Sequence, residues 1–447
     1  MTTISFEREV SVRHEVDVFV AGGGPSGIAA ALAAARQGAS VYIAEGQACF
    51  GGMGTAGLVP AFMCFTDRVN FLADGVGREI YERMKQRADT PRDDPGGSVS
   101  INAEALKLVY DDVIQEARAQ GPGNIDFTFH TQVIGVDAEG GHVNAAICAA
   151  KSGLYAVQAK VFVDGTGDGD LAVWAGAPFE KGDADGHMMP GTLCSLWANV
   201  DWDRVSERQD RNLTAAFADN VFTVQDRHLP GMWQVGPGIG GGNIGHTFGV
   251  DGTDERSLTQ ALLWGRRSLS EYEVYYKRYL EGFEAMSLVA TGALLGLRET
   301  RRIIGDYVLC LDDFESRAVF QDEIGRYNYP VDIHASTPNT EDFAKFEDEF
   351  KRLRYETGES YGIPYRILTP RGLDNVLVAG RCVSTDRYMQ GSIRVMPGCY
   401  ITGQAAGVAA SLAAAETMDV HAVDVSKLQA LLKAQGAYLP NAGIGTT

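Results

Sequence analysis

Three glycines near the start of the chain have the spacing of a phosphate-binding turn. Gly22, Gly24 and Gly27 follow an apolar, β-branched run at residues 16–21. In a G-x-G-x-x-G turn, the glycines permit a tight bend, a close approach of the backbone to a pyrophosphate, and close packing of the next helix on the strand. That helix would present free N–H groups and its positive dipole end to the phosphates. The residues expected to contact the phosphates are Gly22, Gly24, Pro25, Ser26 and Gly27.

A carboxylate follows this turn at the distance that a dinucleotide site requires. An alanine-rich helical stretch runs to Gln37, Gly38 ends it, and residues 41–44 have the composition of a second buried strand. Glu45 closes that strand, 23 residues after Gly22, where its carboxylate can accept hydrogen bonds from ribose hydroxyls. Because no arginine stands beside Glu45, an adenosine with a free 2′-hydroxyl is favoured. The nucleotide is therefore expected to be FAD or NAD.

Two histidines are candidates for chemistry on a substrate. His334 lies two residues after Asp332 in the segment PVDIH, so on a strand both side chains leave the same face. The carboxylate would then orient the imidazole, which predicts a general acid or base; a structural histidine bound to backbone is the alternative. His246 lies in the glycine-rich segment GGNIGHT. Loops of this type commonly cover substrates, so we expect His246 to contact one.

Three arginines form a tight basic cluster in an acidic protein. If the segment is helical, Arg298 and Arg302 share one face by their i, i+4 spacing, and Glu299 and Asp306 are near enough to pair with them. The third member is Arg301. This arrangement predicts structural ion pairs.

A second glycine motif is present near the middle of the chain. Gly236, Gly238 and Gly241 also spell G-x-G-x-x-G. No β-branched strand precedes them and no helical pattern follows, so the motif fails the context test for a nucleotide site. Residues 236–241 are predicted to be a flexible loop, and the chain to bind one dinucleotide.

The element patterns predict an α/β fold in which both ends of the chain form one domain. Residues 376–379 are a buried apolar run like residues 16–21, and an Ala/Gly-rich helical segment follows them. The middle of the chain has longer polar stretches and mixed helical patterns. We expect a Rossmann-like nucleotide-binding domain with a parallel sheet and three layers, made of residues 1–178 and 362–447. An inserted α+β substrate or cap domain would occupy residues 179–361.

The segment GGMGTAG at residues 51–57 and the turn before it resemble a known signature. Residues 22–45 match G-x-G-x-x-G-x3-A-x3-A-x2-G-x6-E, the FAD-binding signature of the glutathione-reductase-like superfamily. Later segments, VDGTGDGDLA, LRETRRIIGDYVL, YPVDIH, IPYRIL and NVLVAGR…GSIRVMPGCYITGQAAGVAA, are similar to FAD-dependent oxidoreductases related to fumarate reductase and succinate dehydrogenase flavoproteins. The resemblance implies FAD as the cofactor. The contacts that it adds are Gly51, Gly52, Met53, Thr55, Val133, Gly167, Asp168, Gly380, Arg381, Arg394, Met396, Gly403 and Gln404.

The chain departs from that family's pattern at two positions. Gln390 stands where fumarate reductases have a substrate-binding histidine, which argues against fumarate-type dicarboxylate chemistry. Arg394 matches their arginine and is expected to bind substrate or to face the flavin N1–O2 locus. Glu45 falls at the spacing of the histidine that succinate dehydrogenases link to flavin, so FAD is expected to be noncovalent.

Composition limits the partners of the protein. The 447 residues include 58 acidic and 39 basic side chains, a net charge of −19, which repels phosphate backbones and anionic membranes. No apolar run approaches the roughly 20 residues that cross a bilayer. The seven cysteines are scattered, and residues 1–14 contain no apolar leader. We therefore expect a cytoplasmic protein with a small-molecule substrate, no nucleic-acid or membrane partner and no metal site, with a homo-oligomer left open.

These features together predict a FAD-dependent oxidoreductase, either a dehydrogenase or a reductase. It would act on a small organic substrate by hydride transfer at flavin N5. His334 would be the general acid or base, Asp332 would orient it, and Arg394 and His246 would bind substrate. The alternative is a flavoprotein electron-transfer subunit that works with an iron–sulfur partner, since the chain has no cysteine cluster of its own.

Overall fold

The largest sheet is built from strands at both ends of the chain, as the sequence predicts. In the computed structural model, which describes residues 4, 7–206, 212–227 and 231–443, the strand order is β5-β2-β1-β8-β7-β6, with β17 also paired to β8. The first five strands named below are parallel, and β7 and β6 continue the sheet as an antiparallel meander. The strands are β5 (Asn124–Thr128), β2 (Ser40–Ala44), β1 (Val12–Ala21), β8 (Gly153–Asp164), β17 (Val376–Val378), β7 (His142–Ala150) and β6 (Gln132–Glu139).

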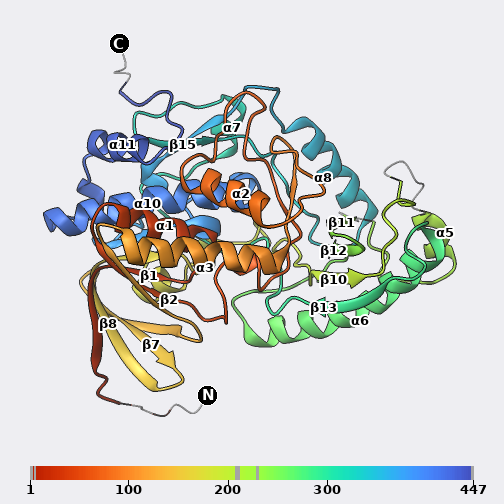
Figure 1. Cartoon of the computed structure of the whole chain (residues 1–447), viewed down its shortest axis with the longest axis horizontal. Helices are drawn as coiled ribbons and strands as arrows, with labels where there is room; N and C mark the ends of the chain where they lie inside the picture. The colour runs from red at the N-terminus through yellow and green to blue at the C-terminus, as the bar shows by residue number, and fades with distance from the viewer. Residues whose placement is uncertain (1–3, 5–6, 207–211, 228–230, 444–447) are drawn as a thin grey trace.

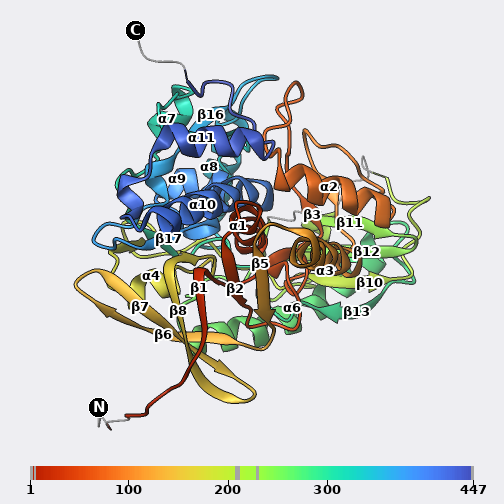
Figure 2. The same cartoon turned by 60° about the vertical axis from the view of Figure 1, so that its left-hand side comes forward.

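Two alanine- and glycine-rich helices, α1 and α10, lie against each other beside this sheet (Figures 1 and 2). A Cβ added at Gly403 or Gly407 would overlap the backbone of Ser26 or Ala30, so only glycine permits this approach. Because α10 comes from the far end of the chain, the glycine turn and the C-terminal segment share one core. The helices here are α1 (Pro25–Arg36), α10 (Met396–Glu416), α2 (Val76–Arg87) and α3 (Ala103–Gln120). The predicted α/β fold class is confirmed.

A second sheet, four-stranded and antiparallel, lies in the middle of the chain in the order β11-β12-β10-β13. Trp197, Tyr275 and Met286 belong to its apolar core, which is made of residues between 193 and 295 and is separate from the larger core. This separate core is consistent with an inserted unit, whose exact bounds stay a prediction. The elements are β10 (Ser195–Ala198), β11 (Gly231–Gly236), β12 (Ile239–Asn243), β13 (Ser287–Thr291), α5 (Leu213–Ala218) and α6 (Glu255–Tyr279).

The prediction of a flexible loop at residues 236–241 is wrong. β11 and β12 pair there as an antiparallel hairpin, and Gly238 turns the chain with φ +64°. A Cβ at Gly240 would lie 2.7 Å from the Met232 sulfur, and one at Gly241 would lie 2.5 Å from Pro60 Cβ. The glycines therefore serve close packing of the sheet. Since the segment joins two antiparallel strands, it lacks the strand-turn-helix geometry of a nucleotide site.

The remaining elements correct two local predictions. The arginine cluster is not helical, because residues 301–303 form a strand paired with residues 179–181, a tertiary partner that overrides the helical spacing. Asp332 and His334 lie in an irregular segment outside any helix or strand. The elements are β3 (Ala61–Phe62), β4 (Val99–Ser100), β9 (Phe179–Lys181), β14 (Arg301–Ile303), β15 (Glu323–Tyr327), β16 (Tyr361–Pro364), α4 (Asp170–Trp174), α7 (Leu311–Glu315), α8 (Thr340–Arg352), α9 (Arg387–Ile393) and α11 (Val425–Ala434).

None of the helices in the described residues is both long enough and apolar enough to cross a membrane. Residues 1–3 and 5–6, within the stretch predicted to hold no leader, lie outside the described part of the chain.

Candidate active site

The glycine turn has the backbone geometry that phosphate binding needs. Gly22 ends the first strand with φ +88°, and its N–H donates to the end of β2 at 2.9 Å. A Cβ on Gly27 would overlap the carbonyl oxygen of Gly22, whereas the space beside Gly24 is open. Helix α1 begins at Pro25 with Gly24 as its N-cap, and no side chain caps its first N–H groups. The helix start is thus free to receive an anion.

The segment at residues 51–57 lies directly against this turn. The Gly51 N–H donates to the Gly23 carbonyl at 2.8 Å. Met53 lies in the short 3-10 helix η1 (Gly52–Gly54), and the Thr55 hydroxyl donates to a backbone carbonyl at 2.6 Å. Two glycine-rich segments therefore meet at the carboxyl end of the parallel strands, where α/β folds bind their ligands.

Glu45 stands where a ribose would follow the phosphates. Its carboxylate accepts the Gly23 N–H and the Gln47 N–H, each at 2.6 Å. Burial raises the pKa of Glu45, although these two N–H groups oppose the rise. The Thr131 N–H donates to the Glu45 carbonyl at 2.9 Å, and Val133 follows on β6. The sequence reasoning therefore located a carboxylate that touches the turn itself.

Residues 380–381 join the glycine turn to the turn that follows β8. The Arg381 Nε–H donates to the Gly167 carbonyl at 3.0 Å, and its guanidinium pairs with the Asp168 carboxylate. A Cβ at Gly380 would lie 2.6 Å from the Ser26 hydroxyl oxygen. Three separate segments that the resemblance assigns to the cofactor thus lie side by side.

The start of α10 lies beside the same segments. Its N-cap is Val395, which offers no side-chain cap, whereas α3, α6 and α11 begin with capping asparagine or aspartate side chains. A Cβ at Gly54 would lie 2.9 Å from the Met396 sulfur. Gly380 lies between the two helices, since its N–H donates to the Thr402 hydroxyl at 3.1 Å. Two helix starts without side-chain caps, those of α1 and α10, therefore approach one place.

Two residues that the resemblance assigns to the cofactor have other contacts. Gly403 packs on the backbone of Ser26 in α1. The Gln404 side-chain oxygen accepts the Val76 N–H at 3.0 Å, and the Gln404 side-chain amide donates to the Gln435 backbone carbonyl at 3.3 Å. Helix packing and the start of α2 account for both residues.

Buried polar atoms without partners also fit a large polar cofactor. Among the described residues, Arg394 Nε and the Gln390 side-chain oxygen are buried and have no hydrogen-bond partner. The Gln390 amide donates to the Arg381 carbonyl at 3.3 Å, which places it beside the segments above. Burying a polar atom without a hydrogen-bond partner costs free energy, so each such atom needs an explanation. The glycine cradle, the two helix starts and these atoms together fit FAD.

The two histidines singled out from the sequence are in contact. His334 Nδ1 and His246 Nε2 are 3.0 Å apart, and both side chains are almost fully buried. His334 Nε2 lies 3.3 Å from Asp332 Oδ1, so the predicted His–Asp pairing is present although the segment is not a strand. Nothing in the local sequence of either histidine shows that they meet, because they are 88 residues apart.

Asp332 connects the histidines to Arg394. The Arg394 guanidinium donates to Asp332 Oδ2 at 2.9 Å and to its carbonyl at 3.2 Å, and the Tyr329 hydroxyl donates to Oδ2 at 3.2 Å. Burial alone would raise the pKa of Asp332, but His334 and Arg394 lower it well below its ordinary range. Asp332 therefore stays ionised. Since Arg394 stands two residues before α10, this cluster borders the cofactor segments.

A further carboxylate, which the sequence reasoning missed, holds the other histidine. His246 Nδ1 lies 2.9 Å from Asp226 Oδ2. Burial lowers the pKa of His246, and the charge of Asp226 opposes the change. No motif surrounds Asp226, so only the fold shows its role. The result is a buried chain of side chains from Asp226 through His246, His334 and Asp332 to Arg394.

The second sheet covers the segment at residues 51–57. The Ala293 N–H donates to the Ala56 carbonyl at 2.8 Å, and a Cβ at Gly292 would lie 2.8 Å from the Gly57 carbonyl oxygen. The unit built on the second sheet therefore contacts the segment at residues 51–57 directly.

The arginine cluster divides into two kinds of contact. Arg302 pairs with Glu299 at 2.5 Å, as predicted. The pairing predicted for Arg298 is wrong, since Asp306 pairs with His421 and the Arg298 guanidinium donates to neutral oxygens instead. The pairing of Arg298 was predicted wrongly because the i, i+4 spacing suggested a helix, and the segment is not helical.

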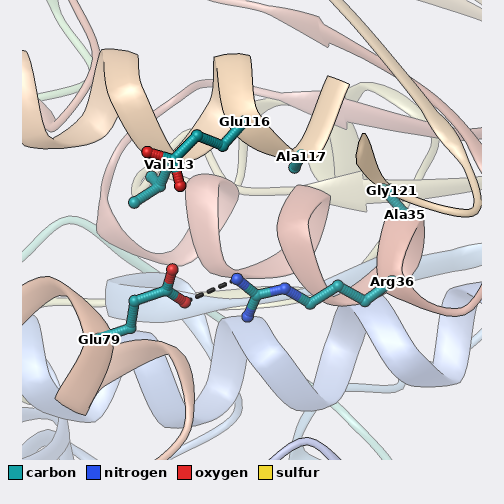
Figure 3. A pocket seen from close by; sticks show the side chains of 7 residues that line it. All are labelled: Ala35, Arg36, Glu79, Val113, Glu116, Ala117 and Gly121. Carbon is teal, nitrogen blue, oxygen red and sulfur yellow. Dashed lines mark hydrogen bonds and ion pairs between the residues drawn. The ribbon is translucent and has the colours of Figure 1, made fainter. Parts of the chain in front are cut away.

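Two other features lie apart from this site. Figure 3 shows a hollow at the end of α1 farthest from the glycine turn, where Arg36 pairs with Glu79 at 2.6 Å. Its lining residues are Ala35, Arg36, Glu79, Val113, Glu116, Ala117 and Gly121. Separately, Asp183, Asp185 and His187 hold potential metal-ligand atoms within 4.8 Å of one another. The Asp183 side chain accepts both neighbours' N–H groups, at 3.0 and 2.9 Å, as in an ordinary turn.

Comparison with known proteins identifies one family and several similar solved structures. A family model described as FAD dependent oxidoreductase matches residues 17–432. No curated protein sequence matches the chain. Among solved structures, a geranylgeranyl bacteriochlorophyll reductase-like protein from Thermoplasma acidophilum is similar at 14% identity, over 95% of this chain and 84% of that one, with a TM-score of 0.47. p-Nitrophenol 4-monooxygenase from Pseudomonas putida DLL-E4 is similar at 14% identity, over 66% of this chain and 70% of that one, with a TM-score of 0.43.

Proposed function

The chain belongs to the family of FAD-dependent oxidoreductases, and from this premise we propose that it oxidises or reduces a small organic substrate beside the His246–His334 pair. The observation that carries the proposal is the buried chain from Asp226 to Arg394, which ends two residues before the start of α10. Ionisable groups with shifted pKa values gather at functional sites, and these lie next to the cofactor cradle.

We propose that FAD is held by residues that the sequence assigns to it, with the starts of α1 and α10 among them. FAD supplies the acceptor or donor of a hydride at N5 when it is bound. Glu45 would receive the ribose, and the starts of α1 and α10 would face the pyrophosphate and the pyrimidine end of the ring system. The proposed set is Gly22, Gly24, Pro25, Ser26, Gly27, Glu45, Gly51, Gly52, Met53, Thr55, Val133, Gly167, Asp168, Gly380, Arg381, Arg394 and Met396.

His334 would hold or release the proton that accompanies oxidation or reduction of the substrate. The ionised Asp332 fixes the ring through Nε2, and His246 contacts Nδ1. Both ring nitrogens therefore have a contact, and a substrate must replace one of them to reach His334. The 3.3 Å contact to Asp332 is longer than an ordinary N–H···O bond, and catalytic contacts often tighten only when substrate is bound.

Arg394 would position the substrate or the cofactor. Its NH2 group is held by Asp332, while its buried Nε lacks a partner among the described residues. The finer kinship with fumarate reductase and succinate dehydrogenase flavoproteins belongs to this proposal. Gln390 in place of their histidine predicts a substrate other than fumarate.

Anaerobic reduction of the bound flavin tests the proposal. The wild-type protein and His334→Ala are mixed with a panel of small alcohols, amines and hydroxy acids, and the loss of the oxidised flavin absorbance is followed. We expect flavin reduction in His334→Ala to be at least about 100-fold slower than in the wild type, because general acid–base groups contribute 10²–10⁴-fold to the rate. His421→Ala, whose ring pairs with Asp306 in a different part of the molecule, is the matched control. An unchanged rate in His334→Ala excludes His334 from the proton step.

A further inference from the structure

Arg298 differs from the other deeply buried arginines of the described residues. Arg298, Arg302 and Arg326 are only 7%, 3% and 7% exposed. Arg302 pairs with Glu299 at 2.5 Å and Arg326 pairs with Glu323 at 2.7 Å. In the part of the chain that the structure describes, no carboxylate lies within 4.0 Å of the Arg298 guanidinium. Burying a cation that contacts no carboxylate costs free energy, so the burial of Arg298 needs a physical explanation.

Neutral oxygens hold the Arg298 guanidinium in place. It donates to the Pro190 carbonyl at 2.8 Å, to the Thr192 hydroxyl at 2.9 Å and, more weakly, to the Asn243 side-chain oxygen at 3.4 Å. These contacts fix its orientation but supply no negative charge. A guanidinium has five N–H donors, so donors remain after these three bonds. Burial lowers the pKa of Arg298 to about 10, which still leaves it charged at neutral pH.

The orientation brings Arg298 next to the histidine pair. The Thr192 hydroxyl that it contacts donates to the Gly245 carbonyl at 2.9 Å, and His246 is the next residue. After burial, the positive charge of Arg394 is the largest influence on the pKa of Arg298, and Asp332 acts on it as well. Arg298 therefore belongs to the same cluster of charges as His246, Asp332 and Arg394, although it comes from a different segment.

The carboxylates of this cluster contact other side chains and not Arg298. Asp332 pairs with Arg394, and Asp226 pairs with His246. The Arg298 guanidinium is thus fixed in place with no carboxylate in direct contact, and N–H donors remain after its three bonds. This is the arrangement that recognises a single carboxylate, because a guanidinium offers two parallel N–H groups to its two oxygens.

We infer that Arg298 receives the carboxylate of the substrate, so the substrate class is small organic acids with one carboxylate beside the reacting carbon. This inference rests on the proposed function, because it specifies what enters the site beside His334. Arg298 would bind the acid group, and the histidine pair would face the part of the molecule that reacts. The neutral partners of Arg298 would keep it oriented before the substrate arrives.

The test is a titration of the FAD-loaded protein with propionate, and with its neutral isostere propionamide, at constant ionic strength. Binding is followed by the flavin difference spectrum and separately by the rise in unfolding temperature. We expect propionate to bind at least about 10-fold more tightly than propionamide, because a charge-assisted pair is roughly twice as strong as a neutral hydrogen bond. Equal affinities for the two, or tighter binding of inorganic phosphate than of propionate, would overturn the inference.

Variants locate the binding. Arg298→Met should lose at least about 10-fold in propionate affinity and no longer distinguish the two probes, and Arg298→Lys should lie between, since lysine keeps the charge but not the fork. Arg204→Met removes an exposed arginine of the same unit, paired with Glu284, and should bind propionate like the wild type. If Arg298→Met does not fold, the inference is tested by the propionate affinity of Arg298→Lys and by the ratio of propionate to propionamide affinity in the wild type. Unchanged propionate affinity together with a shifted flavin midpoint potential would show that Arg298 faces the cofactor, which contradicts the inference.

The two proposals fail in different ways. A protein that takes up no FAD contradicts the proposed function, while the unfolding temperature still reports whether propionate binds at Arg298. A protein that binds FAD and needs His334 for flavin reduction, but does not prefer propionate, contradicts only the inference about the substrate.

Discussion

Asp164 is fully buried and the Asp332 side chain is 19% exposed, and their surroundings shift the pKa values of the two carboxyl groups in opposite directions. Asp164 ends β8 in the cofactor half and accepts the Thr166 N–H at 3.0 Å and the Ala172 N–H at 2.9 Å. Burial raises its pKa to about 6. Burial would also raise the pKa of Asp332, but His334 and Arg394 reverse the shift and lower it strongly.

The difference shows how the two halves of the site are built. The proposed cofactor half consists of backbone groups, glycines and helix starts, and each of its parts is encoded within a few residues. The proposed substrate half consists of ionisable side chains from segments that are far apart in the chain, such as Asp226, His246 and Arg394. The first can be damaged by adding one methyl group, and the second by removing one charge.

The largest effect on FAD binding is expected from a methyl group in the glycine turn. Gly27→Ala places a Cβ on the carbonyl oxygen of Gly22, so the turn must shift. Overpacking of this kind costs about 3 kcal/mol, and we expect FAD affinity to fall about 100-fold, measured by the flavin retained after dialysis. Gly135→Ala is the control, because no atom lies within 4 Å of its added Cβ. Full retention of FAD by Gly27→Ala would show that the turn is not the phosphate site.

The next effect comes from removing the charge that joins the histidines to Arg394. Asp332→Asn leaves Arg394 without its ion-pair partner, and breaking a buried pair costs about 3–5 kcal/mol of unfolding free energy. Chemical denaturation measures the loss, and Asp332→Asn combined with Arg394→Gln should recover part of it. Glu284→Gln breaks the exposed pair with Arg204 and should cost less than about 1 kcal/mol. Equal losses from Asp332→Asn and Glu284→Gln would contradict the account of the cluster.

A smaller effect is the pH dependence of the unfolding free energy, to which Asp164 and Asp332 contribute with opposite signs. The folded protein holds a proton on Asp164 up to pH about 6, whereas the ordinary pKa is 3.8. Asp164 therefore contributes stability that is fully present below pH about 4, is lost as the pH rises toward 6 and is absent above it, about 3 kcal/mol in all. Asp332 has the opposite sign, since its contribution is lost only when the pH falls below its ordinary range. Asp164→Asn should flatten the slope of unfolding free energy between pH 4 and 6, and an unchanged slope would refute the assignment.

The parts of this molecule that were predictable are those with local causes. The G-x-G-x-x-G turn, Glu45 and the apolar runs predict the parallel sheet, because their spacing follows from the geometry of the turn. His334 and Asp332 were paired correctly from a separation of two residues, although their segment is not a strand. The β11–β12 hairpin was missed because its glycines carry no side-chain pattern, and close packing on Met232 and Pro60 is visible only in the fold.

The parts that were not predictable depend on distant segments. The contact between His246 and His334 spans 88 residues, and Asp226 lies in no motif. Arg298 was misjudged because helical spacing suggested local ion pairs, whereas its segment lies beside a short strand and its partners are 106 and 108 residues away. Charge balance across a site is a property of the folded chain, and no window of sequence contains it.

A crystal structure of the FAD-loaded protein is the most direct test of whether the two halves form one site. The account predicts the pyrophosphate at the start of α1, the flavin ring against Met53 and Met396, and the His246–His334 pair and Arg298 facing the ring from the inserted unit. A flavin ring on another side of the α10 start, out of reach of His334 and Arg298, would contradict it.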